Sequence, residues 1–469
     1  YDYLANEKLI SYARKDAEII YVGKKGGAHT LPQDKINELI ISKAKEGRIV
    51  IRLKGGDPFI FGRGGEEAEE LADAGIPFEV IPGVTSAIAV PAYAGIPLTH
   101  RDFTTTVAFV TGHEDPTKED SNIAWDKLAT GIGTIVFLMG VGNLPLIVGN
   151  LIKYGRNPKT PVAIIRWGTM SDQETVVGAL DNIVELAKKK NIKPPAITVV
   201  GDVVSLRERL NWFESKPLFG KRIIVTRARE QASGLSEILE SYGAEVIEFP
   251  TIEIIPPEDW DDLDRAIDEI EKYDWLIFTS VNGVRFFIER LKEKRKDARS
   301  LKGLKLCAIG PKTAEMMEGF GLRPDFVPSE YRAEGFIEGI GGESISGKKI
   351  LLPRAEVARE VLPDELSKMG ADVDVVIAYR TVKPTGDIEK VKTMLREKKI
   401  AAITFTSSST VKNFVEMIGG DTGLLEGVVV ASIGPVTTKT VTEYGIKADV
   451  MPEEYTINAL AEALMDYFK

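Results

Sequence analysis

Two ionisable side chains stand at turns near the start of the chain, where they could move protons. Asp2 lies where a strand-like segment meets a helix-like one, and Lys24 follows Gly23. A carboxylate and an ammonium group both suit general acid–base catalysis. An Asp at such a junction is more often a helix N-cap, however, and a lone Lys is more often a solvated surface residue. From spacing alone, the structural interpretation is favoured for both.

Five glycine-containing turns follow apolar, β-rich segments in residues 1–214. They are Gly55-Gly56-Asp57-Pro58, Pro82-Gly83-Val84-Thr85-Ser86, Gly112-His113, Gly140 and Gly168. Ligands of open α/β sheets bind outside the carboxyl ends of the strands, and glycine there lets the backbone approach a ligand closely. One such turn is more often plain turn chemistry, but five in one half of the chain favour a ligand site.

A second group of turns, in the C-terminal half, carries hydroxyl groups. The residues are Thr279, Ser280, Thr313, Thr406, Ser407 and Thr437. Hydroxyl and backbone N–H groups at the ends of strands suit the binding of carboxylates. The same hydroxyls are also good helix caps, and one residue can serve both purposes.

Strands and helices must position these turns, and residues 1–214 alternate between the two. The amphipathic run Glu66–Ala74, stopped by Gly75 and Pro77, predicts a helix. The predicted strands are Arg48–Leu53, Val107–Thr111, Thr134–Met139, Pro161–Ile165 and Ala196–Val200. This alternation is typical of an α/β fold with a parallel sheet.

The C-terminal half contains an internal repeat. Three segments recur 127 residues later and two recur 124 residues later. The matches are Gly220–Ala228 with Gly347–Ala355, Tyr242–Val246 with Met369–Val373, Phe278–Ser280 with Phe405–Ser407, Ala308–Thr313 with Ser432–Thr437, and Pro328–Tyr331 with Pro452–Tyr455. Five matches in order indicate a duplication. Each copy is predicted as strand–helix–strand–helix, so we expect two similar α/β lobes with facing strand ends and a cleft between them.

Composition excludes several classes of protein. The 469 residues include 60 Lys and Arg against 70 Asp and Glu, a net charge of −10, so the chain has no general attraction for nucleic acid. The single cysteine, Cys307, excludes a disulfide framework, indicates a reducing compartment and is expected to be inert core. Three histidines leave little material for a metal site. Two long uncharged stretches contain prolines and glycines, so neither a membrane span nor a signal peptide is predicted.

The glycine turns of the first half resemble a known family. The run Arg52–Glu67, RLKGGDPFIFGRGGEE, resembles the signature of uroporphyrinogen-III C-methyltransferases, and the pattern continues at Ile81–Ser86, Gly95–Arg101, Thr111–His113 and Val162–Thr169. The resemblance covers residues 1–214, and the GGDP block is specific to tetrapyrrole methylases. It implies a two-lobed methylase fold that uses S-adenosylmethionine to methylate uroporphyrinogen III twice. The product is precorrin-2, a precursor of sirohaem and cobalamin.

The resemblance also implies roles for individual residues. Donor contacts fall on Gly55, Gly56, Asp57, Ile60, Thr85, Ser86, Met139 and Gly168. The proposed base and acid of the family fall on Asp2 and Lys24, which reverses the structural interpretation of both. Arg63 and Arg101 would bind substrate carboxylates, or else are surface charges. By residue type alone, Met139 on an apolar strand is more often core than ligand contact.

The sequence departs from the family at its start. The family begins with a strand and a Gly-x-Gly-Pro-Gly-Asp-Pro loop that closes over the donor, whereas this sequence starts after that loop. If the chain begins at Tyr1, we expect a sheet without its first strand and weak or no methyl transfer. The family further implies a homodimer formed through the methyltransferase domain.

Residues 215–469 resemble the uroporphyrinogen-III synthases, on the motifs Phe-Thr-Ser, Ile-Gly-Pro-x-Thr and Ala-Tyr-Arg-Thr. The resemblance implies two flavodoxin-like lobes, discontinuous in sequence, that cyclise hydroxymethylbilane to uroporphyrinogen III with inversion of ring D and loss of water. Tyr379 matches the family's tyrosine and is predicted to donate a proton to the departing hydroxyl; the alternative is a core tyrosine. The six hydroxyl residues named above and Arg227 would bind propionate and acetate groups. Arg354 stands at the position equivalent to Arg227, so one of the two can be structural.

The combined interpretation is a cytoplasmic bifunctional enzyme that acts on small tetrapyrroles and binds neither nucleic acid nor membrane. Two alternatives stay open at this point. The first half could methylate another acceptor, such as RNA or a protein, although the acidic charge argues against RNA. The second half could be a non-catalytic two-lobed ligand-binding module with an inert Tyr379. The substitution Tyr379→Phe separates the last alternative from a synthase.

Overall fold

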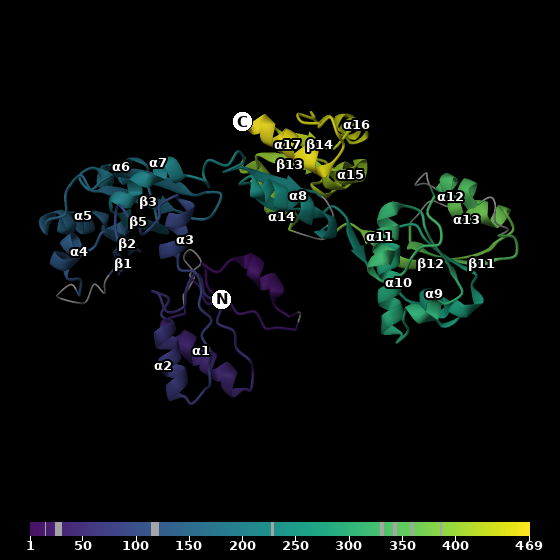
Figure 1. Cartoon of the computed structure of the whole chain (residues 1–469), viewed down its shortest axis with the longest axis horizontal. Coiled ribbons are helices and arrows are strands. Elements are labelled where there is room, and N and C mark those ends of the chain that lie inside the picture. Colours follow the sequence, from purple (N-terminus) through teal and green to yellow (C-terminus); the bar gives the residue numbers. More distant parts are fainter. Residues whose placement is uncertain are drawn as a thin grey trace. The chain divides into compact units, whose positions relative to one another are not determined.

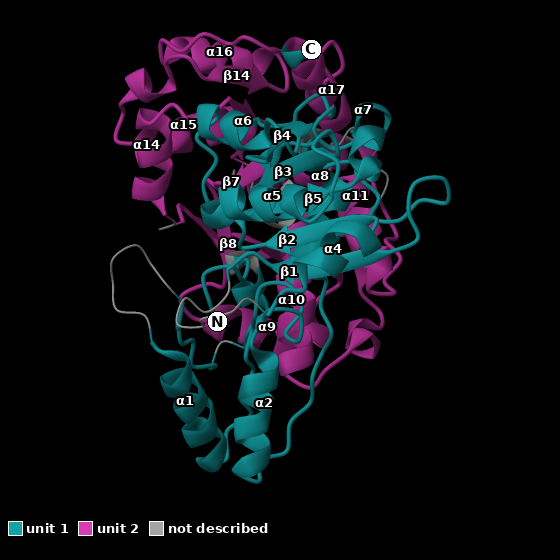
Figure 2. Cartoon of the chain, turned by 90° about the vertical axis from the view of Figure 1, so that its left-hand side faces the viewer, with its two compact units in different colours: residues 1–221, 239–245, 468–469 teal, residues 222–238, 246–467 magenta. Residues whose placement is uncertain are grey.

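The computed structural model describes residues 1–14, 16–23, 31–113, 122–226, 229–328, 333–340, 345–357, 361–384 and 387–469. They divide into two compact units (Figure 2). Unit 1 comprises residues 1–221, 239–245 and 468–469, and unit 2 comprises residues 222–238 and 246–467.

Unit 1 contains one five-stranded sheet in the order β1-β2-β5-β3-β4. Its strands are β1 Val107–Thr111, β2 Thr134–Leu138, β3 Pro161–Arg166, β4 Glu174–Ala179 and β5 Ala196–Val200. Strands β1 and β2 are parallel, whereas β5 is antiparallel to β2 and β3, and β4 is antiparallel to β3. The four strands predicted between residues 107 and 200 are confirmed. The prediction of a parallel sheet is wrong, because the sheet is mixed.

The described residues of unit 1 also form helices. They are η1 Glu7–Tyr12, α1 Gln33–Lys45, α2 Gly64–Asp73, α3 Ser86–Tyr93, α4 Trp125–Gly131, η2 Val141–Asn143, α5 Leu144–Lys153, α6 Ile183–Lys189, η3 Asp202–Leu206 and α7 Arg207–Leu210. Successive side chains of a strand point to opposite faces. In β2, Val136 therefore packs in the cluster with Val90 of α3, while Phe137 packs in the cluster with Leu151 of α5. The sheet thus carries two separate apolar cores.

The segment predicted as a strand at Arg48–Leu53 forms no β-ladder. Ile49 and Ile51 are 95% and 81% exposed. A strand is stabilised by hydrogen bonds to a neighbour and by burial of at least one face, and residues 48–53 have neither in the described part of unit 1. The strand prediction is therefore wrong for this structure, although the apolar run that suggested it is real.

The segment that follows α7 is bound tightly to unit 1. The indole N–H of Trp212 donates to the Ala92 carbonyl at 3.0 Å. The Glu214 carboxylate accepts hydrogen bonds from Gln173 at 2.7 Å and Thr175 at 2.6 Å, and it pairs with Arg207. This joint is therefore a packed extension of unit 1 rather than a loose linker.

The rest of the chain contains two sheets. The sheet of lobe A has the order β14-β13-β6-β7, and that of lobe B has the order β10-β9-β11-β12-β8. The strands are β6 Arg222–Val225, β7 Glu245–Glu248, β8 Glu253–Ile255, β9 Trp275–Phe278, β10 Lys305–Ala308, β11 Lys349–Ala355, β12 Asp372–Val382, β13 Ala402–Phe405 and β14 Val429–Ser432. Ladders β9–β10, β9–β11, β11–β12, β6–β13 and β13–β14 are parallel.

Helices α8 to α17 accompany these sheets. They are α8 Arg229–Ser241, α9 Asp261–Asp268, α10 Val281–Glu293, α11 Pro311–Gly319, α12 Ala333–Ile340, α13 Val361–Lys368, α14 Ile388–Arg396, α15 Ser408–Met417, α16 Pro435–Glu443 and α17 Ile457–Phe468. Figure 1 shows α8 in the same lobe as α14 to α17, although they lie far apart in the sequence.

The repeat explains this arrangement. It relates β6 to β11, β7 to β12, β9 to β13 and β10 to β14, so the two sheets have the same strand order. Each sheet contains two of these strands from the first copy and two from the second. The expectation that the lobes are discontinuous in sequence is therefore confirmed for lobe A, whose strands come from residues 222–248 and 402–432, and is wrong for lobe B, whose strands all lie within residues 253–382.

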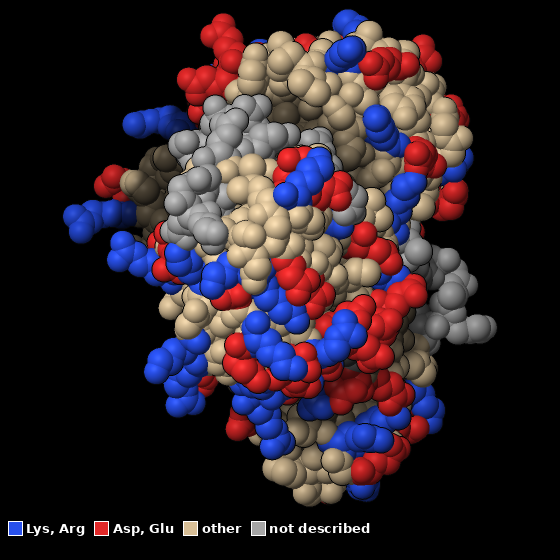
Figure 3. Space-filling model, turned by 90° about the vertical axis from the view of Figure 1, so that its right-hand side faces the viewer, with Lys and Arg blue, Asp and Glu red and all other residues tan. Residues whose placement is uncertain are grey.

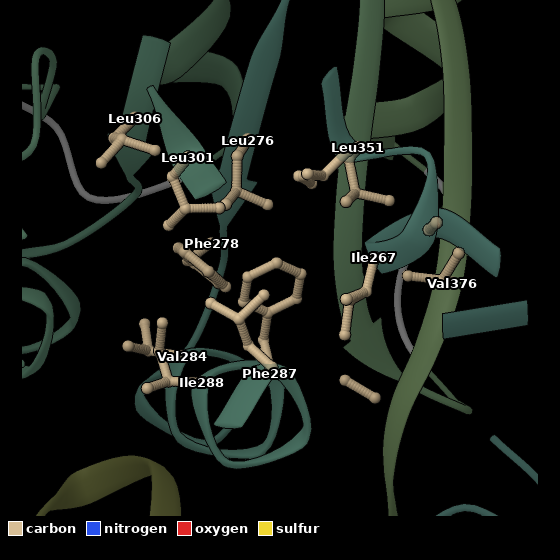
Figure 4. Close-up of a cluster of buried hydrophobic side chains, with 14 of the residues drawn as sticks. Ile267, Leu276, Phe278, Val284, Phe287, Ile288, Leu301, Leu306, Leu351 and Val376 are labelled. Atoms are coloured by element: carbon tan, nitrogen blue, oxygen red, sulfur yellow. The ribbon is translucent and has the colours of Figure 1, made fainter. Parts of the chain in front are cut away.

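The cores of the two lobes repeat in detail. Phe278 and Phe287 lie 5.5 Å apart at 70° in lobe B, and Phe405 and Phe414 lie 5.6 Å apart at 70° in lobe A. All four rings are fully buried. Figure 4 shows Phe278 and Phe287 with Leu276 and Val284 in the space between the strands and helix α10.

The surface shown in Figure 3 carries positive and negative side chains side by side. Pairs such as Arg290 with Asp264 at 2.6 Å and Lys294 with Asp268 at 2.7 Å illustrate this mixing in lobe B. Within the described ranges, no helix is both long enough and apolar enough to cross a bilayer.

Candidate active sites

In unit 1, Asp57 joins two of the predicted glycine turns. Its carboxylate accepts hydrogen bonds from the N–H groups of Phe59 at 2.9 Å, Ile60 at 3.1 Å and Gly83 at 3.0 Å. The Gly83 and Phe59 N–H groups hold the pKa of this carboxyl below its ordinary value. A Cβ at Gly83 would lie 2.2 Å from the Gly56 carbonyl oxygen. Glycine is therefore required where the two turns meet.

The N-terminal segment lies against the same loop. A Cβ at Gly55 would lie 2.7 Å from the Leu4 carbonyl oxygen. The Asp2 carboxylate accepts from the Leu4 N–H at 3.2 Å and from the Arg52 guanidinium at 3.2 Å. The structure thus brings the predicted base beside the predicted donor loop. Lys24, the predicted acid, lies outside the described residues; its described neighbour Gly23 approaches Tyr3.

The predicted Thr85–Ser86 pair begins helix α3. Thr85 is the N-cap, and its hydroxyl accepts from the Ala87 N–H at 3.3 Å. Thr85 is buried, while Ser86 is exposed. A Cβ at Gly168 would lie 2.4 Å from a methyl group of Val90, so this glycine lets the end of β3 approach α3 closely.

Met139 directly follows β2 and has a φ of +56°. A side chain in this region is strained, and such outliers gather at functional sites. The Met139 side chain is 55% exposed, so it is not a core residue. Strands β2 and β3 both run antiparallel to β5. Met139 and Gly168 therefore leave the sheet at the same edge.

The two predicted substrate arginines differ in their surroundings. Arg63, at φ +58°, pairs with Glu66 through contacts of 2.9 and 2.6 Å. Both side chains are about half exposed, and the Arg63 guanidinium holds the pKa of the Glu66 carboxyl below its ordinary value. Arg101 lies exposed in a turn. Both arginines are thus available to a solvent-borne substrate.

In lobe B, Tyr379 meets a predicted partner from another strand. Its hydroxyl lies 3.0 Å from the Ser280 hydroxyl, and its ring stacks on Phe286 at 5.8 Å and 19°. The register of β11 and β12 shifts beside Ala355, which pairs with Tyr379; such bulges re-aim side chains. Tyr379 is 7% exposed. The phenol is therefore held in one orientation among apolar groups.

Each hydroxyl-rich turn leads from a strand into a helix. Ser280 caps α10 by accepting from the Gly283 N–H at 3.0 Å, and Ser407 caps α15 by accepting from the Thr410 N–H at 3.3 Å. Thr313 and Thr437 lie buried in the first turns of α11 and α16, while Thr279 and Thr406 are half-buried. The capping role is thus confirmed for Ser280 and Ser407, and it leaves carboxylate binding open for the hydroxyls as a prediction.

Arg227 lies outside the described residues. Its equivalent, Arg354, is 8% exposed within β11, which favours a structural role for Arg354. Cys307 is fully buried in β10, as expected for core. Among the described side chains, no cluster of His, Cys, Asp and Glu could hold a metal ion.

Two family models match the chain: Tetrapyrrole (Corrin/Porphyrin) Methylases over residues 1–184, and Uroporphyrinogen-III synthase HemD over residues 233–462. The chain is also 38% identical over 466 residues to the porphyrin biosynthesis protein HemD of Ruminiclostridium josui, across 99% of this chain and 92% of that protein. The chain belongs to the family that joins a tetrapyrrole methylase to a uroporphyrinogen-III synthase. We call unit 1 the methylase module and unit 2 the synthase module.

Two further relatives are similar to parts of this chain. The S-adenosyl-L-methionine-dependent uroporphyrinogen III methyltransferase of Methanosarcina barkeri (strain Fusaro / DSM 804) is 57% identical over 210 residues, across 45% of this chain and 82% of that protein. The uroporphyrinogen-III C-methyltransferase of Bacillus subtilis (strain 168) is 41% identical over 324 residues, across 69% of this chain and 66% of that protein.

Sequence reasoning missed one polar cluster in the methylase module. Glu67 of α2 is 7% exposed, and its Oε1 accepts from Lys54 at 2.8 Å, Gln33 at 3.0 Å and Arg52 at 3.3 Å. A signal was present: Arg52 and Lys54 stand two residues apart in an apolar run, and alternate residues of an extended segment share a face.

Proposed function

We propose that the chain is a bifunctional enzyme of tetrapyrrole biosynthesis. Its synthase module cyclises hydroxymethylbilane to uroporphyrinogen III, and its methylase module methylates that product twice to precorrin-2. The observation that carries the proposal is that both families occur in one chain and that one relative matches 99% of it. Because the product of the second module is the substrate of the first, each assignment supports the other.

The methylase module offers a backbone cradle that suits S-adenosylmethionine. The close approach of Gly56 and Gly83 leaves main-chain groups of both turns accessible, and Gly55, Asp57, Ile60, Thr85, Ser86, Met139 and Gly168 would complete the donor site. When bound, the donor supplies a sulfonium methyl group to a pyrrole carbon, with the C–S electron pair remaining on sulfur. The charged ring must then lose a proton, which Asp2 would accept. Lys24 would supply the acid, and Arg63 and Arg101 would hold the substrate carboxylates.

The synthase module would act mainly through orientation. Ring closure breaks the C–O bond of the hydroxymethyl group and forms a C–C bond to ring D, and the departing hydroxyl takes a proton to leave as water. Inversion of ring D also requires that the existing C–C bond between this ring and its bridge carbon breaks and re-forms at the other α carbon of the ring. Tyr379 would donate the proton to the departing hydroxyl, and a proton lost from the pyrrole carbon would restore the phenol. Ser280 lies 3.0 Å from the phenol and can share its proton. The remaining hydroxyl residues and Arg227 would bind the acetate and propionate groups in one folded conformation.

The experiment is incubation of the purified chain with hydroxymethylbilane, with and without S-adenosylmethionine. Products are oxidised and resolved by isomer and mass. Type III isomer without the donor, and a dimethylated product with it, are the expected results. Type I isomer alone would refute the synthase assignment and favour a ligand-binding module. Type III isomer without methylation would refute the methyltransferase assignment.

We further propose that the enzyme is a cytoplasmic homodimer whose precorrin-2 feeds sirohaem or cobalamin synthesis. The single buried cysteine supports a reducing compartment. Light scattering on the purified chain tests the homodimer, since a mass near 51.5 kDa would refute it.

A further inference from the structure

Arg52 links three parts of the methylase module. Its Nη2 donates to Asp2 Oδ2 at 3.2 Å, its Nε to Glu67 Oε1 at 3.3 Å, and its Nη1 to the Leu53 carbonyl at 2.9 Å. The Arg52 side chain is 16% exposed, and that of Asp2 is 27% exposed. The guanidinium is thus directed by three acceptors at once.

Glu67 is the fixed end of this cluster. Its carboxylate is buried at the start of α2 and also accepts from Lys54 and Gln33. A buried carboxylate with several charge-assisted partners is costly to displace. Asp2, by contrast, lies half-buried just before a turn, and among the described residues its carboxylate also accepts from the Leu4 N–H. Glu67 therefore fixes the Arg52 guanidinium, and Arg52 in turn holds the Asp2 carboxylate.

We propose that Arg52 is a positioning residue that holds the Asp2 carboxylate beside the Gly55–Asp57 loop. This inference rests on the proposed role of Asp2 as the base of methyl transfer. The Leu4 backbone, which follows Asp2, already touches Gly55. Fixing the carboxylate at one end of this contact would keep it at a constant place relative to the donor loop.

The planar fork of arginine suits this task better than lysine does. One edge of the guanidinium reaches Glu67 while a second nitrogen reaches Asp2, and a single ammonium group cannot reproduce both directions with the same geometry. The conservative variant Arg52→Lys should therefore retain the charge and recover only part of the function.

A double-mutant cycle tests the proposal on the full chain with supplied uroporphyrinogen III. Arg52→Gln should lower kcat for methyl transfer by about tenfold to a hundredfold, with Arg52→Lys in between. In the Asp2→Asn background, the same change should cost less than about twofold, because Arg52 then has no base to position. An equal loss in both backgrounds overturns the proposal. Should Arg52→Gln fail to fold, Arg52→Lys takes its place in the cycle.

A second readout is independent of catalysis. Hydrogen exchange of the N-terminal peptide that contains Asp2 and Leu4 should be faster in Arg52→Gln, and unchanged exchange overturns the proposal. Arg14→Gln is the matched control, because Arg14 pairs with Asp16 on the surface, with both side chains more than two-thirds exposed; it should leave exchange at Leu4 and kcat unaltered. Full activity of Asp2→Asn would refute the role of Asp2 as base, while faster exchange in Arg52→Gln would still support the positioning contact.

Discussion

A single phenol carries most of the chemistry proposed for the synthase module. Tyr379 is buried between the Phe286 ring and the Ser280 hydroxyl. Because Ser280 already accepts from the Gly283 N–H, its own hydrogen is free to point toward Tyr379 or toward a substrate. The phenol therefore has a partner that can both orient it and exchange a proton with it.

Removing the phenolic hydroxyl should reduce ring closure without unfolding the module. Tyr379→Phe keeps the stacked ring but loses the proposed proton donor, so we expect formation of the type III isomer to slow by about a hundredfold or more. The measurement is the initial rate of uroporphyrinogen III formation, corrected for spontaneous type I product. Ser280→Ala keeps the phenol and should lose less. An unchanged rate in Tyr379→Phe would show that the tyrosine is a core residue only.

The hydrogen bonds to the Asp57 carboxylate predict that the stability of unit 1 depends on pH. The pKa of this carboxyl is lowered in the folded state by the Gly83 and Phe59 N–H groups, so the unfolded chain takes up this proton first as the pH falls. The stabilisation is complete above a pH of about 4, near the ordinary carboxyl pKa, and is lost as the pH falls through the lower folded pKa.

Asp57→Asn should therefore destabilise unit 1 at neutral pH, and its difference from the unsubstituted chain should shrink in acid. Hydrogen exchange of peptides from residues 55–60 and 80–86, measured at several pH values, checks this. The variant should also bind S-adenosylhomocysteine more weakly, as calorimetry would show. A difference that grows in acid would contradict the assignment.

At the scale of elements, the duplication predicts that equivalent phenylalanines contribute similar free energies of unfolding to the two lobes. Phe287 and Phe414 occupy equivalent positions and are both fully buried. Phe287→Ala and Phe414→Ala should each destabilise their own lobe by about 3–5 kcal/mol, and by similar amounts. Urea unfolding followed by hydrogen exchange assigns the loss to one lobe. Phe287→Leu should cost less, and a loss under about 1 kcal/mol in either alanine variant would contradict equivalent packing.

The sequence predicted elements well where burial determines them. Strands β5, β6, β9, β13 and β14 carry apolar runs that are buried on both faces, so period and composition suffice. The run at residues 48–53 is also rich in β-branched residues, yet Ile49 and Ile51 are exposed, because pairing depends on a neighbour that the run itself does not encode. Strand β4, half-exposed at the sheet edge, has a weak apolar pattern and was missed.

For the candidate sites, too, the sequence indicated some residues and not the contacts that depend on packing. Motif resemblance identified Asp57, Thr85 and Tyr379, because their turns have distinctive neighbours. It gave no indication that Ser280 would meet Tyr379, since the two lie 99 residues apart in the chain. Nor did it find Arg52 and Glu67, because a buried ion cluster between α2 and a loop depends on packing rather than on spacing.

At the scale of the whole molecule, the two modules should work independently. Asp2→Asn should lose methyl transfer and retain the synthase, and Tyr379→Phe should do the reverse, so each variant is the control for the other. Mixed together with hydroxymethylbilane and S-adenosylmethionine, the two should restore formation of the dimethylated product, because each supplies one intact module and uroporphyrinogen III can diffuse between them. A mixture that forms uroporphyrinogen III but no dimethylated product would instead indicate transfer within one chain.

The exchange of strands between the two copies of the repeat bears on how the chain is made. Strand β6 pairs with β13, and Ile223 of β6 lies opposite Ala402 of β13. The sheet of lobe A therefore cannot form until the chain has been synthesised beyond residue 402. Lobe B, which spans residues 253–382 without interruption, can close while the ribosome is still producing the later segments. Such distant pairings are slow to form, and unpaired strands invite aggregation. Strands β6 and β7 of lobe A therefore remain without their partner β13 during most of synthesis, and we expect this interval to be the one in which the nascent chain is most open to aggregation.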